Sequence, residues 1–296
     1  MPRVLNTSTE EKWLYTISSK HKLINLNFKE IWRYRDLLLL FVKRDVITLY
    51  KQTILGPLWY LIQPLFTAVI FTLIFSNLAK IPAGGEGSLV PPFLFNLAGI
   101  TLWSYFKECL TGTSNTFAKN QNIFGKVYFP RVIMPMSVVV SNLVKFSIQI
   151  ILFIGFYIYF VFVSGIDISP NKYLILLPVL VVIMGLLGLG FGMIISSLTT
   201  KYKDLTMLVT FGVQLLMYAS AVPYPLSYFK QELPKHAFLI EYNPITAIIE
   251  TFRYITLGEG QFSFFYLSYA AVFGLMVFFI GLIIFNRTEK TFIDTV

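Results

Sequence analysis

The stretch YKQTILGPLWYLIQPLF, residues Tyr50 to Phe66, joins a polar and basic segment to the first long apolar run of the chain. Gly56 and Pro57 stand at the junction, and Gln63 and Pro64 lie near the start of the apolar run. Proline removes a backbone donor and bends helices, and a glutamine is costly among apolar neighbours. The stretch therefore predicts an elbow, followed by a helix that is polar and bent near its entry.

The composition of the whole chain indicates a membrane protein. Its 296 residues are 56% hydrophobic and 13% charged, with a mean hydropathy of +0.69, whereas an average soluble chain carries about 25% charged residues. The apolar residues form continuous runs of roughly 20 residues, the length that crosses a hydrocarbon core of about 30 Å. A β-barrel would show short alternating strands instead, so we predict an all-α polytopic membrane protein.

The apolar runs predict six transmembrane helices per protomer. Their approximate ranges are 58–78, 93–112, 136–163, 173–198, 205–222 and 262–285. Two basic loops fall on the same side as both termini, one with Lys119, Lys126 and Arg131 and one with Lys201 and Lys203. Basic loops favour the cytoplasm, and the first residues lack the apolar segment of a signal peptide. We therefore expect cytoplasmic N- and C-termini, and the net charge of +9 reflects topology rather than nucleic-acid binding.

The residues before the first apolar run form two predicted segments. Residues 1–27 are a polar N-terminal cytoplasmic extension, and residues 28–50 are an amphipathic helix, followed by the transmembrane domain at 51–296. A helical repeat places Lys29, Arg33, Asp36, Lys43 and Arg44 on one face and Ile31, Tyr34, Leu38, Phe41, Val42 and Leu49 on the other. Such a helix suits the membrane interface. A helix packed on a soluble core is the alternative.

The segment at 223–261 is too polar to cross a membrane and too apolar for an ordinary loop. We predict two short re-entrant helices on the outer side, between the fifth and sixth spans, covered by protein or water. The residues expected to shape the second helix are Asn243 as its cap, Pro244 in its first turn, Glu250 and Arg253 as an i, i+3 ion pair, and Gly258 as its C-terminal stop.

Sequence motifs argue against an enzyme. The chain has two histidines and no H-E-x-x-H, G-x-S-x-G or paired metal-ligand spacing. Its single cysteine, Cys109, excludes an internal disulfide and a cysteine metal cluster. We therefore predict no catalytic residue and no metal site. The phosphate-binding motif G-x-x-x-x-G-K-[ST] is also missing, so we expect no cofactor in this chain, and if transport needs energy, a separate subunit must supply it.

Few charged residues interrupt the apolar runs. Lys107, Glu108 and Lys145 lie towards the cytoplasmic ends of the second and third runs. Lysine can extend its ammonium group to the membrane surface, so we expect interfacial positions rather than a buried ion relay. This weighs against a transporter driven by protons or sodium. In the fourth run, the small residues from Gly185 to Gly192 predict close helix packing.

Four stretches together resemble a known family. They are RDVITLYKQTILGPLWYLIQPLFTAVIFTLIF (44–75), GKVYFPRVIMPMSVVVSNLV (125–144), KYKDLTMLVTFGVQLLMYASAVPYPLS (201–227) and NPITAIIETFRYITLG (243–258). The chain resembles ABC type-2 transporter permeases, and more narrowly the polysaccharide branch that exports O-antigen or teichoic acid.

The resemblance implies a function and its partners. It implies a homodimer, bound to two copies of an ABC ATP-binding subunit that hold ATP and Mg²⁺. This assembly would move a polyprenyl-pyrophosphate-linked polysaccharide from the cytoplasmic side across the bacterial inner membrane. Such a permease would serve O-antigen export in lipopolysaccharide biosynthesis. An ABC exporter of small lipophilic drugs or lipids is the alternative within the class. A membrane-embedded glycosyl- or acyltransferase is a further alternative that has no visible active site.

The expected functional residues fall into three groups. At the cytoplasmic entrance, the basic side chains of Arg44 and Lys51 would attract a pyrophosphate head group or anionic lipid. The other entrance residues would form its hinge: Gly56, Pro57, Gln63 and Pro64. Those of a coupling helix at about residues 118–128 and of the next inner loop would contact the ATP-binding subunit: Asn122 and Phe124 at an exposed turn, Lys126, Lys201 and Lys203. Those of the channel would stack on sugar rings: Phe71, Phe75, Trp103, Phe211 and Tyr218. Ordinary basic loops and interfacial aromatic belts are the alternatives.

Overall fold

The computed structural model describes residues 32–51, 56–84, 88–124, 129–166, 168, 170–202 and 204–295. Every regular element in these ranges is a helix, so the all-α prediction is confirmed. The elements are α2 (Arg35–Lys51), η1 (Gly56–Leu58), α3 (Trp59–Phe71), the π-helix η2 (Thr72–Leu78), α4 (Pro92–Ser114), α5 (Thr116–Phe124), α6 (Ile133–Phe162), η3 (Lys172–Leu176), α7 (Leu177–Lys201), α8 (Leu205–Tyr218), α9 (Leu226–Glu232), α10 (Ala237–Glu241), α11 (Pro244–Leu257) and α12 (Phe264–Thr295). The extension at 1–27, Lys126 and Lys203 lie outside the described residues.

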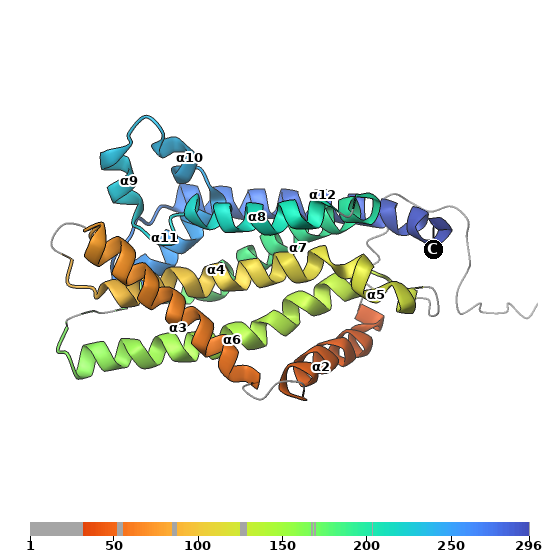
Figure 1. The fold of residues 1–296 in the computed structure, drawn as a ribbon, viewed down its shortest axis with the longest axis horizontal. Coiled ribbons are helices and arrows are strands. Elements are labelled where there is room, and N and C mark those ends of the chain that lie inside the picture. The colour runs from red at the N-terminus through yellow and green to blue at the C-terminus, as the bar shows by residue number, and fades with distance from the viewer. Residues whose placement is uncertain are drawn as a thin grey trace, which may run out of the picture.

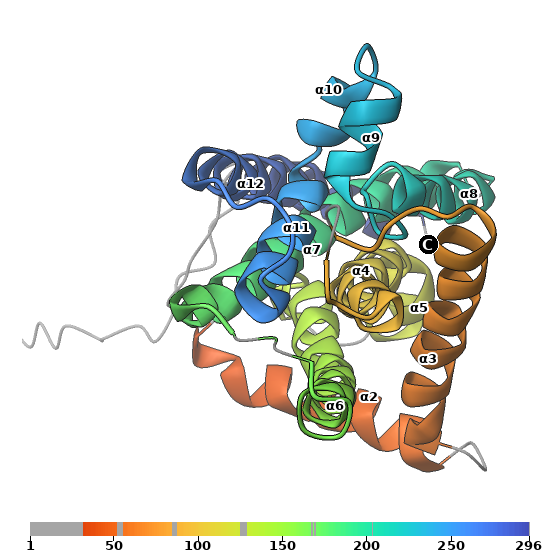
Figure 2. The same cartoon turned by 90° about the vertical axis from the view of Figure 1, so that its left-hand side faces the viewer.

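The helices form an elongated bundle. α4, α6, α7, α8 and α12 run along its length, and α3 crosses them obliquely (Figure 1). At one end lie α9, α10 and α11, and at the other lie α5 and the last turns of α12; we name these the α11 end and the α5 end. A view along the bundle places α4 and α7 inside, with α3, α6, α8 and α12 around them (Figure 2).

Four helices of the described chain are long and apolar enough to cross a membrane, at Trp59–Leu78, Ile133–Phe162, Lys172–Lys201 and Phe264–Glu289. They overlap the first, third, fourth and sixth predicted runs. α4 covers the second run. α8, on the fifth run, has 14 residues and a length of about 21 Å at 1.5 Å per residue. It ends four residues earlier than the sequence predicts; Ala221 beyond it has φ +51°, which is outside the helical region.

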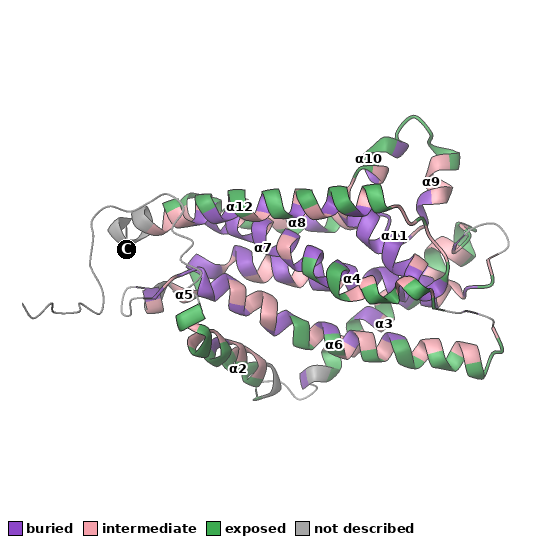
Figure 3. Cartoon of the chain, turned by 180° about the vertical axis from the view of Figure 1, so that it is seen from behind, coloured by how far each residue is buried: buried purple, intermediate pink, exposed green. Residues whose placement is uncertain are grey.

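Glycines set the close packing of α7 against both of its neighbours. A Cβ atom built on Gly188 would lie 2.6 Å from Cys109 Cβ, and one on Gly192 would lie 2.5 Å from Thr113 Cβ. Gly190 faces α12, where an added Cβ would lie 2.8 Å from Phe278 N. The absence of a side chain lets the backbones approach, as small residues do between membrane helices. The predicted close packing by this glycine run is confirmed, and buried residues accordingly concentrate on α4, α7 and α11 (Figure 3).

α2 lies outside the bundle against α6 and η1. Its Phe41 is buried at 6% exposure, and Tyr34 and Leu38 pack beside it on the core at the α5 end. The apolar face that the sequence assigned to the membrane therefore packs partly on the protein. Leu39 and Leu40 are exposed on the other side of the helix, at 58% and 60%.

The α11 end is built around one buried arginine. Asn243 Oδ1 accepts a hydrogen bond of 3.0 Å from the backbone N–H of Ile245, Pro244 is the first residue of α11, and Gly258 ends the helix with φ +73°. From α11, Arg253 donates hydrogen bonds to Glu250 (3.0 Å) and to the carbonyl oxygens of Ala221 (2.9 Å) and Val222 (2.6 Å) in the loop after α8. Its guanidinium also lies 3.7 Å from the centre of the Phe95 ring on α4. Arg253 thus joins three separate segments.

An aromatic cluster occupies the α5 end. Phe117 on α5 stacks on Phe285 of α12 with ring centres 4.5 Å apart, and Phe124 lies 5.8 Å from Phe117. Phe129 lies 6.0 Å from Phe124 and 5.9 Å from Phe41 of α2. The cluster therefore connects α2, α5 and α12 through direct ring contacts.

Candidate functional site

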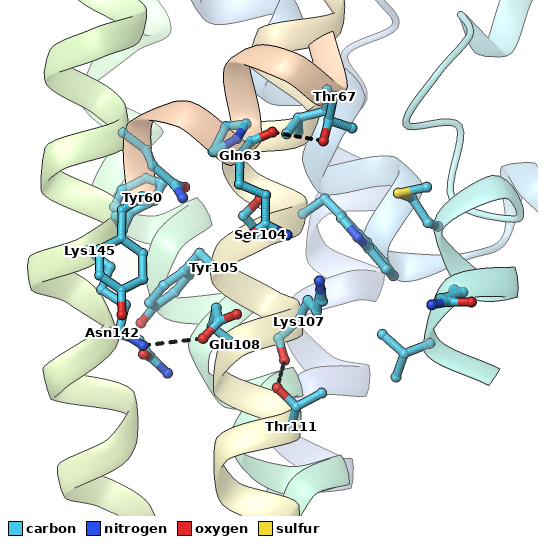
Figure 4. Close-up of a pocket in the computed structure, with 18 of the residues that line it drawn as sticks. Tyr60, Gln63, Thr67, Ser104, Tyr105, Lys107, Glu108, Thr111, Asn142 and Lys145 are labelled. Carbon is cyan, nitrogen blue, oxygen red and sulfur yellow. Dashed lines mark hydrogen bonds and ion pairs between the residues drawn. The ribbon is translucent and has the colours of Figure 1, made fainter. Parts of the chain in front are cut away.

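A cavity of about 320 Å³ lies between α3, α4, α6 and α8 (Figure 4). Most of the side chains on its wall carry polar groups, although the helices that supply them are apolar. They are Tyr60, Gln63 and Thr67 from α3; Ser104, Tyr105, Lys107, Glu108 and Thr111 from α4; Asn142, Lys145 and Gln149 from α6; and Thr210 and Gln214 from α8. We name this cavity the α3–α8 pocket. Its volume lies at the lower end of the range of roughly 300–1,000 Å³ that is typical of ligand sites.

An ion pair crosses the α3–α8 pocket. Lys145 Nζ lies 3.2 Å from Glu108 Oε2 (Figure 4). The same ammonium group lies 5.0 Å from the centre of the Tyr60 ring. The sequence predicts separate interfacial positions for Glu108 and Lys145, and it did not predict that they pair. The signal was present, because ionisable residues within membrane helices usually have a partner on another helix.

Two further groups of the α3–α8 pocket lack a partner among the described residues. The carboxamide oxygen of Gln149 is buried and accepts no hydrogen bond, and the residue is 6% exposed. Lys107 has no carboxylate within ion-pair distance in the described part of the chain. Buried polar groups are normally hydrogen-bonded, so the Gln149 oxygen is open to a ligand or water. Lys107 is half-buried, and its ammonium group is available to an anion.

The predicted entrance residues divide into two sets. Gln63 and Pro64 line the α3–α8 pocket, and Pro64 is buried inside α3, which remains helical through it. Gly56 is buried with φ +40°, a conformation that favours glycine, and Pro57 follows in η1, so the chain turns between α2 and α3 at this point. No structure is described for the four residues before Gly56.

Arg44 and Lys51 do not line the α3–α8 pocket. Arg44 pairs with the neighbouring Asp45 at 2.8 Å and lies 4.9 Å from the Phe41 ring centre. Lys51 is exposed at the last residue of α2. Both basic groups therefore lie on the exterior of this protomer.

The predicted channel aromatics do not form one continuous row. Trp103 lines the α3–α8 pocket and is 3% exposed. Phe71 has its ring centre 5.5 Å from that of Phe75 and 6.5 Å from that of Tyr218. Phe211 is exposed at 60% on α8. The five side chains thus lie at three places, of which only that of Trp103 is on the pocket wall.

The predicted coupling residues lie at the α5 end. Phe124 is 5% exposed inside the aromatic cluster, so the expectation of an exposed turn is wrong for this side chain. Its direct ring neighbours, Phe117 and Phe129, are close in sequence, but the cluster that buries them also includes Phe41 and Phe285, which a local reading does not reveal. Asn122 belongs to α5, but its side chain lies outside the described residues, as do Lys126 and Lys203. Lys201 is exposed at the end of α7, 5.4 Å from the Tyr202 ring centre.

A second cavity, of about 340 Å³, lies at the α11 end. There Lys230 Nζ lies 2.7 Å from Glu241 Oε1 and 3.1 Å from Gln261 Oε1, and Tyr266 donates a hydrogen bond of 2.7 Å to Glu241. Burial raises the pKa of Glu241, but these hydrogen bonds from Lys230 and Tyr266 outweigh it, and the pKa of the carboxyl lies below its ordinary value. The charges around this cavity pair with one another, so we take the α3–α8 pocket as the candidate site.

Comparison with known proteins identifies the family. The model of the ABC-2 type transporter family matches residues 36–257. An O-antigen export system permease protein RfbA from Klebsiella pneumoniae is 27% identical over 261 residues, covering 88% of this chain and 94% of that protein. Another RfbA, from Myxococcus xanthus, is 26% identical over 230 residues, covering 77% and 82%. The match spans the pocket helices and most of the bundle, and the chain therefore belongs to the ABC-2 type transporter family of integral membrane proteins.

Proposed function

We propose that this protein is the permease subunit of an ATP-driven exporter in the bacterial inner membrane. Its substrate is a polysaccharide of the O-antigen kind, carried on a polyprenyl pyrophosphate and moved outward from the cytoplasmic side. The family match and the names of the related permeases support this proposal.

The observation that carries the proposal is the set of polar side chains on the wall of the α3–α8 pocket. Polar groups inside a membrane helix bundle are costly unless they serve a polar solute or water. Ser104, Thr210 and Gln214 offer hydrogen bonds of the kind that sugar hydroxyl groups need. A lipophilic drug would need few such groups, so the number of hydrogen-bonding side chains favours the glycan exporter over the drug exporter.

The working unit that we propose is a homodimer with two ATP-binding subunits. α3 and α8 expose apolar side chains away from the bundle, including Phe66 (65%) and Leu73 (51%) on α3–η2 and Leu208 (65%) and Leu215 (53%) on α8. A second protomer packed there would cover these faces and close a path over both α3–α8 pockets. The path would thus lie between the α3 and α8 helices of the two protomers.

The remaining topology follows from this arrangement. α4 and α8 complete six spans together with the four long helices, both termini lie in the cytoplasm, and the α5 end faces the ATP-binding subunits. α2 lies in the membrane interface, where Leu39 and Leu40 contact lipid. α9, α10 and α11 form the re-entrant outer segment. The chain contains no phosphate-binding motif of its own, so the partner hydrolyses ATP. Movement of α5 then reaches α2 and α12 through the aromatic cluster.

Deletion of the gene tests the proposed function. We expect surface polysaccharide to be lost and lipid-linked glycan to accumulate inside the cell, with recovery on re-expression. Ser104→Leu, which replaces a pocket hydroxyl group with an apolar side chain, should reduce export. Ser147→Leu, the same change at an exposed position of α6 outside the pocket, should not. Unchanged surface polysaccharide in the deletion strain contradicts the proposal, and increased drug sensitivity instead supports the drug exporter.

A further inference from the structure

The α3–α8 pocket carries an excess of positive charge. Its wall holds two ammonium groups, Lys107 and Lys145, and one carboxylate, Glu108. Only Lys145 pairs with that carboxylate. An uncompensated charge is expensive inside a membrane protein, so the pocket favours a ligand that brings negative charge.

The Glu108–Lys145 pair is built so that an anion can replace the carboxylate. The side chain of Lys145 is 16% exposed and is held against the Tyr60 ring, whereas that of Glu108 is 40% exposed. An ammonium group has three donors, and Glu108 and the Tyr60 face are the two contacts that the described residues give it. Glu108 therefore resembles an internal substitute for a ligand oxygen, and it is the partner with room to move away.

Amide groups extend the site along α6. Asn142, Lys145 and Gln149 lie three and four residues apart, on the same face of the helix. The buried oxygen of Gln149 has no hydrogen-bond partner. Rotation of its carboxamide would turn the NH₂ group to that position and let it donate to an acceptor. Phosphate oxygens are acceptors, and charge-assisted bonds to them are the strong ones.

Part of the wall of the α3–α8 pocket is apolar. Ile100 of α4 and Val213 and Met217 of α8 line it beside the polar groups. A ligand that fills the whole cavity therefore contacts both charged and apolar side chains.

We propose that the α3–α8 pocket binds the diphosphate group of a prenyl diphosphate lipid. Lys145 and Lys107 hold the phosphate oxygens, Glu108 is displaced when the lipid binds, and the apolar part of the wall contacts the first isoprene units. This inference rests on the proposed function for the source of the lipid, and it locates the head group inside the bundle rather than at Arg44 and Lys51.

Binding to the purified full-length protein in detergent tests the inference. The probes are farnesyl diphosphate, inorganic pyrophosphate and farnesol, measured by isothermal titration calorimetry. We expect farnesyl diphosphate to bind, pyrophosphate to bind at least tenfold more weakly, and farnesol to show no saturable binding. Equal binding of farnesol and farnesyl diphosphate overturns recognition of the diphosphate. Equal binding of pyrophosphate and farnesyl diphosphate overturns the lipid as the source.

The lysine variants and the glutamate variant should change the affinity for farnesyl diphosphate in opposite directions. Lys145→Gln and Lys107→Gln should each weaken farnesyl diphosphate binding at least tenfold, whereas Lys172→Gln, at the exposed start of η3, should leave it unchanged. Glu108→Gln removes the internal competitor and should strengthen binding severalfold, a gain that a folding defect cannot produce. Weaker binding by Glu108→Gln overturns the displacement step.

The inference and the proposed function can fail separately. If the deletion strain loses surface polysaccharide but the lysine variants bind farnesyl diphosphate as the wild type does, the site is wrong and the function stands. If the variants behave as expected but deletion leaves surface polysaccharide intact, the site stands and the function is wrong.

Discussion

Arg253 and Glu250 form an ion pair with an N–O distance of 3.0 Å in which the two side chains are 0% and 2% exposed. The arginine also donates to the carbonyl oxygens of Ala221 and Val222, whereas its buried Nε has no partner among the described residues. Burial lowers the pKa of Arg253 below its ordinary value, although the adjacent Glu250 carboxylate acts in the opposite direction. The pair therefore holds the loop after α8 against α11, and its two members depend on each other.

Removing one member of this pair should be more harmful than removing both. Arg253→Met leaves the Glu250 charge buried and unpaired, and we expect a loss of about 3–5 kcal/mol of unfolding free energy. The double variant Glu250→Gln with Arg253→Met should recover part of that loss. Denaturant unfolding in detergent micelles measures both values. Arg287→Met, at an exposed position on α12, serves as the control, and equal stability of all variants contradicts the buried-pair account.

The contact between α7 and α12 should not tolerate a single added methyl group. In Gly190→Ala the new Cβ would lie 2.8 Å from backbone atoms of α12, which cannot move aside as a flexible side chain does. We expect a lower midpoint of thermal unfolding and less protein in the membrane. Gly155→Ala on α6 is the matched control, because a Cβ there meets nothing within 4 Å. Its better helix propensity should stabilise slightly, by up to about 1 kcal/mol, so a destabilised control would show that glycine replacement itself is harmful.

These two sites also show what the sequence alone can predict. The cap at Asn243 and the stop at Gly258 depend on backbone requirements within a few residues, so a local pattern suffices. The close approach at Gly190 follows from small residues in an apolar run. Helix identity, order and approximate bounds follow in the same way from apolar length.

The rotation of each helix about its axis was not predictable. Glu108 and Lys145 meet because α4 and α6 turn the relevant faces toward each other, and no local pattern fixes that rotation. Phe124 is buried because its ring contacts Phe117 on the same helix and Phe129 after it, and the cluster continues to Phe285 of α12 and Phe41 of α2. Of the residues that line the pocket, the sequence therefore predicted Gln63 and Pro64 at the entrance and Trp103 in the channel. It did not predict the Glu108–Lys145 ion pair.

The contact between α9 and α10 should persist in mildly acidic solution. Glu241 has a pKa below its ordinary value of 4.5, so its stabilising contribution is full above that value and is lost as the pH falls through the lowered pKa. Hydrogen–deuterium exchange of α9 and α10 amides, corrected for the intrinsic rate, should be constant from pH 7 to about pH 5. Glu241→Gln should exchange faster throughout this range, without a further change at lower pH. Loss of protection well above pH 5 in the wild type contradicts the lowered pKa.

The proline inside α3 should matter for export more than for membrane insertion. Pro64 lacks the N–H that would bond to the carbonyl group of Tyr60, and both residues line the α3–α8 pocket. Pro64→Ala restores that donor and stiffens the helix, so we expect reduced surface polysaccharide at a normal protein level in the membrane. Pro178→Ala is the control, because Pro178 lies in the first turn of α7, where proline fits without loss. Equal export by the two variants would show that the bend has no role in transport.

The aromatic cluster connects the first and the last helix that the structure describes. Phe41 belongs to the first described helix and Phe285 to the last, and the rings of Phe117, Phe124 and Phe129 lie between them. A displacement of α5 is therefore transmitted to both α2 and α12 through the ring contacts. Among the described residues, α3 and α8 contribute no ring to this cluster, so a displacement of α5 does not reach them through these ring contacts.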